Sequence, residues 1–157
     1  MQTVFQTMSD GASLAVYTWL PEQQPKAVLH IVHGMAEHAL RYDDFAKTAC
    51  KKGFAVVASD HRGHGKTGSK SGLMGYLADG DGFRRVVEDQ KEINEEIQKH
   101  YPTLPVIIVG HSFGSFVTQE YIERFGTTVK AAVLIGSAGP NLSVSVASLL
   151  ASLNCTF

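Results

Sequence analysis

The chain has 157 residues, of which 44% are hydrophobic, so it lies within the size range of one domain and can bury an ordinary core. Its 14 basic and 15 acidic residues nearly balance, and no basic stripe interleaved with aromatic residues is present, which argues against nucleic acid as a partner. The two cysteines, Cys50 and Cys155, are too few for a disulfide framework and fit a reducing compartment.

The sequence shows no targeting or membrane-spanning segment. Its N-terminus has neither the basic nor the apolar region of a secretory signal, so we expect a cytoplasmic protein. The longest apolar zone, Ala131–Leu153, is interrupted by Gly136, Gly139 and Pro140, and this excludes it as a membrane span.

The first sixty residues alternate between apolar runs and polar turns. In chain order, the pattern predicts a hairpin over Thr3–Met8 and Leu14–Leu20, a strand over Ala27–Val32, a helix over Tyr42–Lys52 and a strand over Phe54–Ser59. Residues 66–80, which are rich in Gly, Ser and Lys, are predicted to form a long loop.

The second half continues the alternation. It predicts a helix over Asp81–His100, a buried strand from Val106, a helix over Ser115–Phe125 and a buried strand over Ala131–Ile135. The inward stripe of the first of these helices is predicted to consist of Phe83, Val86, Val87, Ile93 and Ile97. Strands that alternate with helices predict an α/β fold with a mostly parallel sheet and helices on both faces.

A Gly-x-Ser-x-Gly pattern, Gly110 to Gly114, joins the strand at Val106 to the helix that follows. This is the context of a nucleophile elbow, in which a tight turn presents a serine at a helix N-terminus whose partial positive charge favours a developing anion. Gly110 and Gly114 have no Cβ to collide with the neighbouring strand and helix. The pattern therefore predicts Ser112 as a nucleophile, and an idle serine in a glycine-tolerant turn is the alternative.

Three motifs in order resemble a known family. They are His33-Gly34-Met35-Ala36-Glu37-His38 followed by Arg41-Tyr42, then Asp60-His61-Arg62-Gly63-His64-Gly65, then Gly110-His111-Ser112-Phe113-Gly114. Each comes at the end of a predicted strand, and together they resemble the monoglyceride lipase and lysophospholipase branch of the α/β-hydrolases. The resemblance implies the α/β-hydrolase fold and a serine carboxylic-ester hydrolase.

The resemblance also implies a role for individual residues. Ser112 would be the nucleophile that forms an acyl-enzyme, and the backbone N–H groups of Met35 and Phe113 would bind the oxyanion. The substrate would be a small-molecule acyl ester, such as a single-chain acyl glyceride or a lysolipid, and no cofactor would be needed. Ser115 stands where many relatives have glycine, and we expect it to tighten the packing without affecting the chemistry. Acyl transfer to an alcohol would use the same residues and stays open.

The catalytic triad is incomplete in this sequence. In this fold the order is Ser, then Asp or Glu, then His, yet no Asp or His follows Phe113. His33, His38 and His111 are alternative bases, but the first two fit a loop-shaping role, and we expect the elbow to turn His111 away from the serine.

We therefore expect the N-terminal part of a longer hydrolase. Residues 1–139 would form part of its core, and residues 140–157 the incomplete start of a helical cap. The strand Ala131–Ile135 would then be left as an unpaired edge of the parallel sheet, with its apolar side chains exposed. Contact with a membrane or micelle would be made through the missing cap. The alternative is a non-catalytic truncated product, or a half-domain that needs a partner chain.

Two further patterns suggest a metal or a phosphate. His30 and His33 lie three apart on a predicted strand, so they point to opposite faces and cannot ligate one metal ion together. Gly65-Lys66-Thr67 imitates the end of a phosphate-binding loop, but Asp60 replaces the leading glycine and no helix is predicted to follow directly. We expect neither a metal nor a phosphate site.

Overall fold

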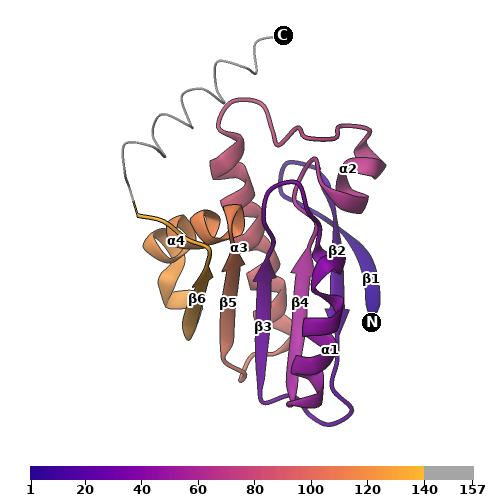
Figure 1. The fold of residues 1–157 in the computed structure, drawn as a ribbon, viewed down its shortest axis with the longest axis vertical. Helices are drawn as coiled ribbons and strands as arrows, with labels where there is room; N and C mark the ends of the chain where they lie inside the picture. The colour runs from indigo at the N-terminus through magenta and orange to yellow at the C-terminus, as the bar shows by residue number, and fades with distance from the viewer. Residues whose placement is uncertain (140–157) are drawn as a thin grey trace.

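The fold is a six-stranded mixed sheet with helices on both faces, as seen in a computed structural model that describes residues 1–139. The strand order is β1-β2-β4-β3-β5-β6 (Figure 1). The first two pairings are antiparallel and the other three are parallel. The strands are β1 Gln2–Thr7, β2 Ser13–Trp19, β3 Ala27–Val32, β4 Phe54–Ser59, β5 Val106–His111 and β6 Ala131–Ile135. The predicted α/β fold is confirmed.

The helices cover both faces because β-strand side chains alternate in direction. On one face, Leu29 and Ile31 of β3 pack with Ala46 and Ala49 of α1. On the other face, Val28 packs with α3, and Val32 packs with α3 and α4. The helices are α1 Asp43–Lys51, α2 Gly65–Ser71, α3 Gly82–His100 and α4 Phe113–Phe125, with short 3₁₀ helices η1 Ala39–Tyr42 and η2 Gly126–Thr128.

The predicted loop over residues 66–80 is partly wrong, because α2 occupies Gly65–Ser71. Its Gly- and Ser-rich sequence has low helix propensity, so tertiary contacts form the helix. The Asp60 carboxylate accepts a hydrogen bond from the Lys66 N–H at 2.7 Å, and Thr67 Oγ1 accepts one from the Ala15 N–H at 2.9 Å. A helix therefore does begin at Gly65, so the expectation that no helix follows directly is wrong. The remaining argument against a phosphate-binding loop is that Asp60 replaces the leading glycine.

Strand β6 was predicted as a core strand that this chain leaves as an open, exposed edge, and among residues 1–139 the exposed edge is confirmed. It forms one edge of the sheet and pairs with β5. Its side chains are exposed, with Val133, Leu134 and Ile135 at 43%, 40% and 48%. The apolar run indicated the strand, and the expectation that the sheet continues in a longer hydrolase indicated the open edge.

Phe83 also departs from the prediction, since it is 36% exposed although it was assigned to the inward stripe of α3. Its ring packs edge-on against Phe113 at 5.9 Å between ring centroids. The rest of the stripe is buried as predicted. Within residues 1–139, no helix is both long and apolar enough to cross a membrane. The predicted cap segment, residues 140–157, lies outside the described residues.

Candidate active site

The Gly-x-Ser-x-Gly turn joins β5 to α4 with a strained backbone at its centre. Ser112 has φ 51° and ψ −118°, a conformation that L-residues rarely adopt, and its side chain is exposed. A Cβ at Gly110 would lie 2.4 Å from the Gly114 carbonyl oxygen, and a Cβ at Gly114 would lie 2.0 Å from the Val32 carbonyl oxygen. Only glycine therefore fits at these two positions, as the sequence predicted.

Backbone hydrogen bonds hold the turn in place. The Ser112 N–H donates to the Ile135 carbonyl at the end of β6, at 2.8 Å. The Ser112 carbonyl accepts two hydrogen bonds from Ser115, one from its N–H at 2.8 Å and one from its hydroxyl at 2.6 Å. Ser115 was expected only to tighten packing, but its hydroxyl binds the backbone of the candidate nucleophile directly.

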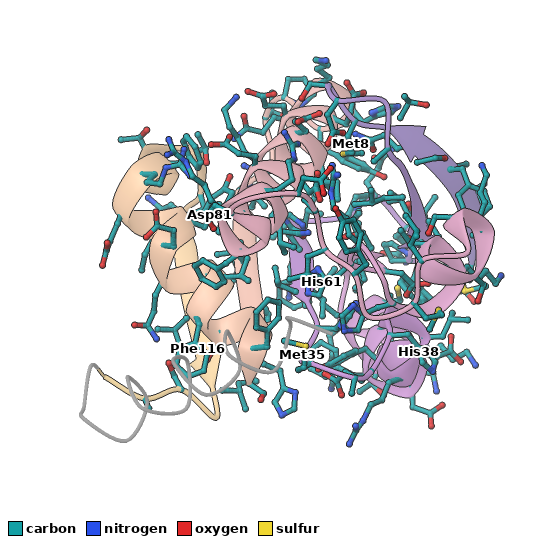
Figure 2. The ribbon with its side chains drawn as sticks, turned by 90° about the horizontal axis from the view of Figure 1, so that it is seen from above. Met8, Met35, His38, His61, Asp81 and Phe116 are labelled. Carbon is teal, nitrogen blue, oxygen red and sulfur yellow. The ribbon has the colours of Figure 1, made fainter. Side chains whose placement is uncertain are left out.

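The loop after β3, residues 33–38, lies directly against this turn because β3 and β5 are neighbours in the sheet. A Cβ at Gly34 would come within 3.3 Å of the His111 carbonyl oxygen, so the two segments are in backbone contact. Met35 follows and is 54% exposed, and Ala36 has a left-handed φ of 56°. Figure 2, viewed onto the carboxyl ends of β3, β4 and β5, shows Met35 between Phe116 on α4 and His38.

Two backbone N–H groups on the adjoining loop and turn have no acceptor of their own. Among residues 1–139, no atom accepts a hydrogen bond from the N–H of Met35 or from that of Phe113. Phe113 begins α4, so its N–H also carries part of the positive end of the helix dipole. An exposed hydroxyl with two free donors on neighbouring segments is an arrangement that can bind an anion.

A pair of histidines determines how the Met35 N–H is oriented. His33 Nδ1 lies 2.7 Å from the Gly34 carbonyl, and His33 Nε2 accepts from the His61 N–H at 2.9 Å, so Nδ1 carries the proton. The Gly34 carbonyl and the Met35 N–H belong to one planar trans peptide and point in opposite directions. The His33 hydrogen bond therefore holds the Met35 N–H away from the His33 ring.

These histidines are buried and neutral. Desolvation lowers the pKa of His33 to about 3, although its hydrogen bond to Gly34 opposes the shift. Desolvation also places the pKa of His61 well below its usual range, with the neighbouring His33 acting in the same direction. His61 Nε2 donates to the His33 carbonyl at 2.9 Å, so the two rings, 3.8 Å apart, bind each other's backbone. Proton transfer by either ring is disfavoured, which fits the expected loop-shaping role of His33.

Glu37 connects the loop to its surroundings. Its carboxylate is buried, and Oε1 accepts from the Gly34 N–H at 2.5 Å and from the Tyr42 hydroxyl at 2.6 Å. His111 Nδ1 lies 3.1 Å from the same oxygen. Burial alone would raise the pKa of Glu37, but hydrogen bonds from Tyr42, Gly34 and His111 outweigh it and lower the pKa. Nothing in the sequence pattern alone assigned this residue a role.

The motif after β4, residues 60–65, holds the loops at the carboxyl ends of the strands in place. The Asp60 carboxylate is fully buried and accepts from the Ala39 N–H at 2.8 Å and from the Tyr17 hydroxyl at 2.8 Å. Arg62 pairs through two nitrogens with the buried Asp89 of α3, at 2.6 and 2.8 Å. These side chains are structural, because their polar atoms are used in contacts within the protein.

A cavity of about 640 Å³ lies beside the loop of Met35. Met35, Leu40 and Met74 give it apolar walls, and His38 and Lys66 give it polar ones. Within residues 1–139, no group of three or more His, Cys, Asp or Glu side chains is arranged to hold a metal ion.

The structure thus places the loop that carries Met35 against the turn that carries Ser112 and Phe113. It turns His111 toward Glu37, as expected of a side chain that does not serve the serine. Sequence reasoning missed Glu37 and the Ser115 hydroxyl. The signal for Glu37 was its place in the His33–His38 motif, but a sequence does not show which donors a carboxylate meets.

Comparisons with known proteins identify the family of the chain. The family model described as serine aminopeptidase, S33 (Hydrolase_4) matches residues 23–154. Monoacylglycerol lipase of Mycolicibacterium smegmatis is 37% identical over 128 residues, 82% of this chain and 44% of that protein. Monoglyceride lipase of Homo sapiens is 35% identical over 109 residues, 69% of this chain and 34% of that protein.

Among solved structures, a thermostable carboxyl esterase from Bacillus coagulans superimposes with a TM-score of 0.85 at 31% identity. The match covers 98% of this chain and 50% of the esterase. The chain therefore spans less than half the length of the two lipases and about half of the esterase.

Proposed function

The chain belongs to the Hydrolase_4 family of α/β-hydrolases, related to the monoglyceride lipases, and from this premise we propose that it carries the nucleophile and oxyanion hole of a serine carboxylic-ester hydrolase. The observation that carries the proposal is the geometry at Ser112. Its hydroxyl is exposed on a strained turn, and the N–H groups of Met35 and Phe113 beside it have no acceptor among residues 1–139.

In the proposed reaction Ser112 Oγ attacks the ester carbonyl carbon, and the carbonyl oxygen becomes an oxyanion between the N–H groups of Met35 and Phe113. The alcohol leaves as the ester bond breaks, and the acyl group stays on Ser112 as an ester. Water then attacks the acyl-enzyme and releases the fatty acid. Each oxyanion donor contributes about 2.7–4 kcal/mol to the stability of the transition state.

A base must take the serine proton, and residues 1–157 do not supply it in the order that this fold uses. No Asp or His follows Phe113 in the sequence, and His111 faces Glu37. We therefore assign the base and its orienting carboxylate to residues outside 1–157. A half-domain that needs a partner chain, or a non-catalytic product, is the competing proposal.

As substrate we propose a single-chain acyl ester, such as a monoacylglycerol or a lysophospholipid. The support is the similarity to monoacylglycerol lipases and the apolar wall that Met35, Leu40 and Met74 place beside the loop. Acyl transfer to an alcohol uses the same intermediate. Product analysis in the presence of added glycerol separates the two, since a transferase forms a new ester and a hydrolase releases free acid.

The test is labelling of Ser112 with a fluorophosphonate at pH 9, where hydroxide can take the proton in place of the missing base. Peptide mass spectrometry should find the adduct on Ser112, and the variant Ser112→Ala should carry none. Thr103→Ala, which removes an exposed hydroxyl in the turn between α3 and β5, should label like the wild type.

The competing, non-catalytic proposal gives the opposite result. It predicts no adduct on Ser112 at any pH. It also predicts no gain in ester hydrolysis when the remaining part of a related lipase is added in trans, whereas the hydrolase proposal predicts a gain that Ser112→Ala abolishes.

A further inference from the structure

The buried carboxylate of Glu37 contacts three separate segments at the candidate oxyanion hole. We propose that Glu37 is a positioning residue that holds the loop of Met35 against the nucleophile elbow, so that the N–H groups of Met35 and Phe113 converge on one oxygen. This inference rests on the proposed function, because it concerns the geometry of the same hole.

The contacts of Glu37 come from both sides of the serine. Oε1 accepts from the Gly34 N–H at 2.5 Å and from the Tyr42 hydroxyl at 2.6 Å, and His111 Nδ1 lies 3.1 Å away. Gly34 directly precedes Met35, and His111 directly precedes Ser112. One oxygen atom therefore joins the loop that carries one oxyanion donor to the turn that carries the other.

The loop needs such a restraint because Gly34 is conformationally permissive. Gly34 lies between two backbone peptide groups. The peptide group after it contains the Met35 N–H and is held by the hydrogen bond from His33 to the Gly34 carbonyl. The peptide group before Gly34 contains the Gly34 N–H, which donates its hydrogen bond to Glu37. With both peptides held, the φ and ψ angles of Gly34 are set and the direction of the Met35 N–H follows.

The close approach of the carboxylate also depends on Gly34. A Cβ at this position would lie 2.8 Å from Glu37 Oε1, so a larger residue would push the carboxylate away from the Gly34 N–H. Ala36, two residues after Gly34, has a left-handed φ of 56°, which is a strained conformation for a non-glycine residue. Because Glu37 follows Ala36 and bonds back to Gly34, its hydrogen bond closes the strained turn.

Three substitutions at Glu37 separate a positioning role from an effect of its charge. Glu37→Gln keeps the length and one acceptor oxygen but loses the charge, Glu37→Asp keeps the charge but shortens the reach by one methylene, and Glu37→Ala loses both. Glu95→Gln on α3 is the matched control, since Glu95 is exposed and pairs with Lys91. Glu37→Asp stays informative if Glu37→Ala does not fold.

The first readout is the limiting rate of fluorophosphonate labelling at Ser112, measured separately from the half-saturating probe concentration. Because a displacement near 1 Å costs roughly a hundredfold in rate, we expect the limiting rate to fall at least about tenfold in Glu37→Asp and Glu37→Ala. The half-saturating concentration should not change. Glu37→Gln and Glu95→Gln should stay within about threefold of the wild type.

Two results would overturn the inference. In one, Glu37→Asp keeps the wild-type rate while Glu37→Gln loses it, which would mean that charge matters and reach does not. In the other, all four variants label like the wild type.

The second readout is amide hydrogen exchange of the segment 33–37 in the unlabelled chain, which needs no reactivity at Ser112. Exchange should be at least about tenfold faster in Glu37→Asp and Glu37→Ala than in Glu37→Gln, with the β3–β5 ladder equally protected in all. If the wild type does not label, the proposed function fails, and this readout alone decides the role of Glu37. Equal exchange of residues 33–37 in every variant would contradict it.

Discussion

At the scale of single residues, the site depends on a strained serine that its neighbours hold in place. A non-glycine residue at φ 51° costs about 1–3 kcal/mol, and the hydrogen bonds from Ser112 to Ile135 and from Ser115 to Ser112 offset that cost. The strain was predictable, because Gly110 and Gly114 leave room for only one kind of turn. The Ser115 hydrogen bond was not, since it depends on a side-chain rotamer that the sequence pattern does not encode.

Gly114→Ala tests the close packing of this turn. The added Cβ would lie 2.0 Å from the Val32 carbonyl oxygen and 2.5 Å from that of His33, so β3 or α4 must shift. We expect a loss of about 1–3 kcal/mol or more in the free energy of unfolding, measured by urea denaturation, and slower labelling of Ser112. Gly126→Ala is the control, because its Cβ would lie 3.8 Å from the nearest atom and its φ of −57° suits alanine. Equal stability of both variants would contradict the account.

At the scale of elements, three loops from the ends of β3, β4 and β5 form the site, and hydrogen bonds between them fix its shape. The sequence predicted all six strands and three of the four α-helices closely, because β-branched runs and helical periodicity are local signals. It missed α2, whose Gly- and Ser-rich residues are helical only through contacts with Asp60 and β2. Partners distant in sequence, such as Glu37 with His111, leave no local signal.

Arg62 should be among the most important side chains for holding these elements together. It binds the buried Asp89 of α3 and also Asp10 in the β1–β2 turn. Burial raises the pKa of Asp89 even though Arg62 and Arg85 lower it, so the carboxylate is costly to leave unpaired. We expect Arg62→Leu to lower the free energy of unfolding by about 3–5 kcal/mol.

Lys91→Gln provides the comparison for Arg62→Leu. It breaks an exposed pair with Glu95 at 2.7 Å and should cost no more than about 1 kcal/mol. Urea denaturation of both variants measures the two losses. A loss for Arg62→Leu no larger than that for Lys91→Gln would show that the Arg62 contacts are not structural.

At the scale of the whole molecule, three buried neutral histidines make the fold sensitive to acid. Desolvation lowers the pKa of His30 to about 4 and that of His33 to about 3, and it lowers the pKa of His61 strongly. In the unfolded chain each histidine takes up a proton below a pKa of about 6.5. Below that pH the unfolded state binds more protons, so stability falls as the pH falls, by up to about 1.4 kcal/mol per pH unit for each histidine.

We therefore expect the free energy of unfolding to fall steeply between about pH 6.5 and 5, before most carboxylates titrate. His30→Gln should reduce the slope of the free energy of unfolding against pH by up to about 1.4 kcal/mol per pH unit, the contribution of one histidine, whatever its effect on stability at pH 7.5. Urea denaturation across this range gives both slopes. Equal slopes for the wild type and the variant would rule out this contribution from His30.

The exposed edge strand β6 predicts association of the chain at high concentration. Val133, Leu134 and Ile135 are exposed on a strand whose outer edge pairs with no residue of 1–139. Such edges are templates for pairing with another chain. Sedimentation velocity should show concentration-dependent association that Val133→Lys reduces.

The control for Val133→Lys is Leu20→Lys, which adds the same charge at a position that is 50% exposed and outside the strands. It should leave the association of the wild type unchanged. A monomer at every concentration, or an equal effect of both substitutions, would exclude the edge of β6 as the cause.

The most direct test of the central claim is a crystal structure of the chain with a phosphonate bound covalently to Ser112. The phosphoryl oxygen stands in the place of the oxyanion, and we expect it about 2.7–3.1 Å from the backbone nitrogens of both Met35 and Phe113. A phosphoryl oxygen bound by neither amide, or an adduct on any residue other than Ser112, would contradict the account.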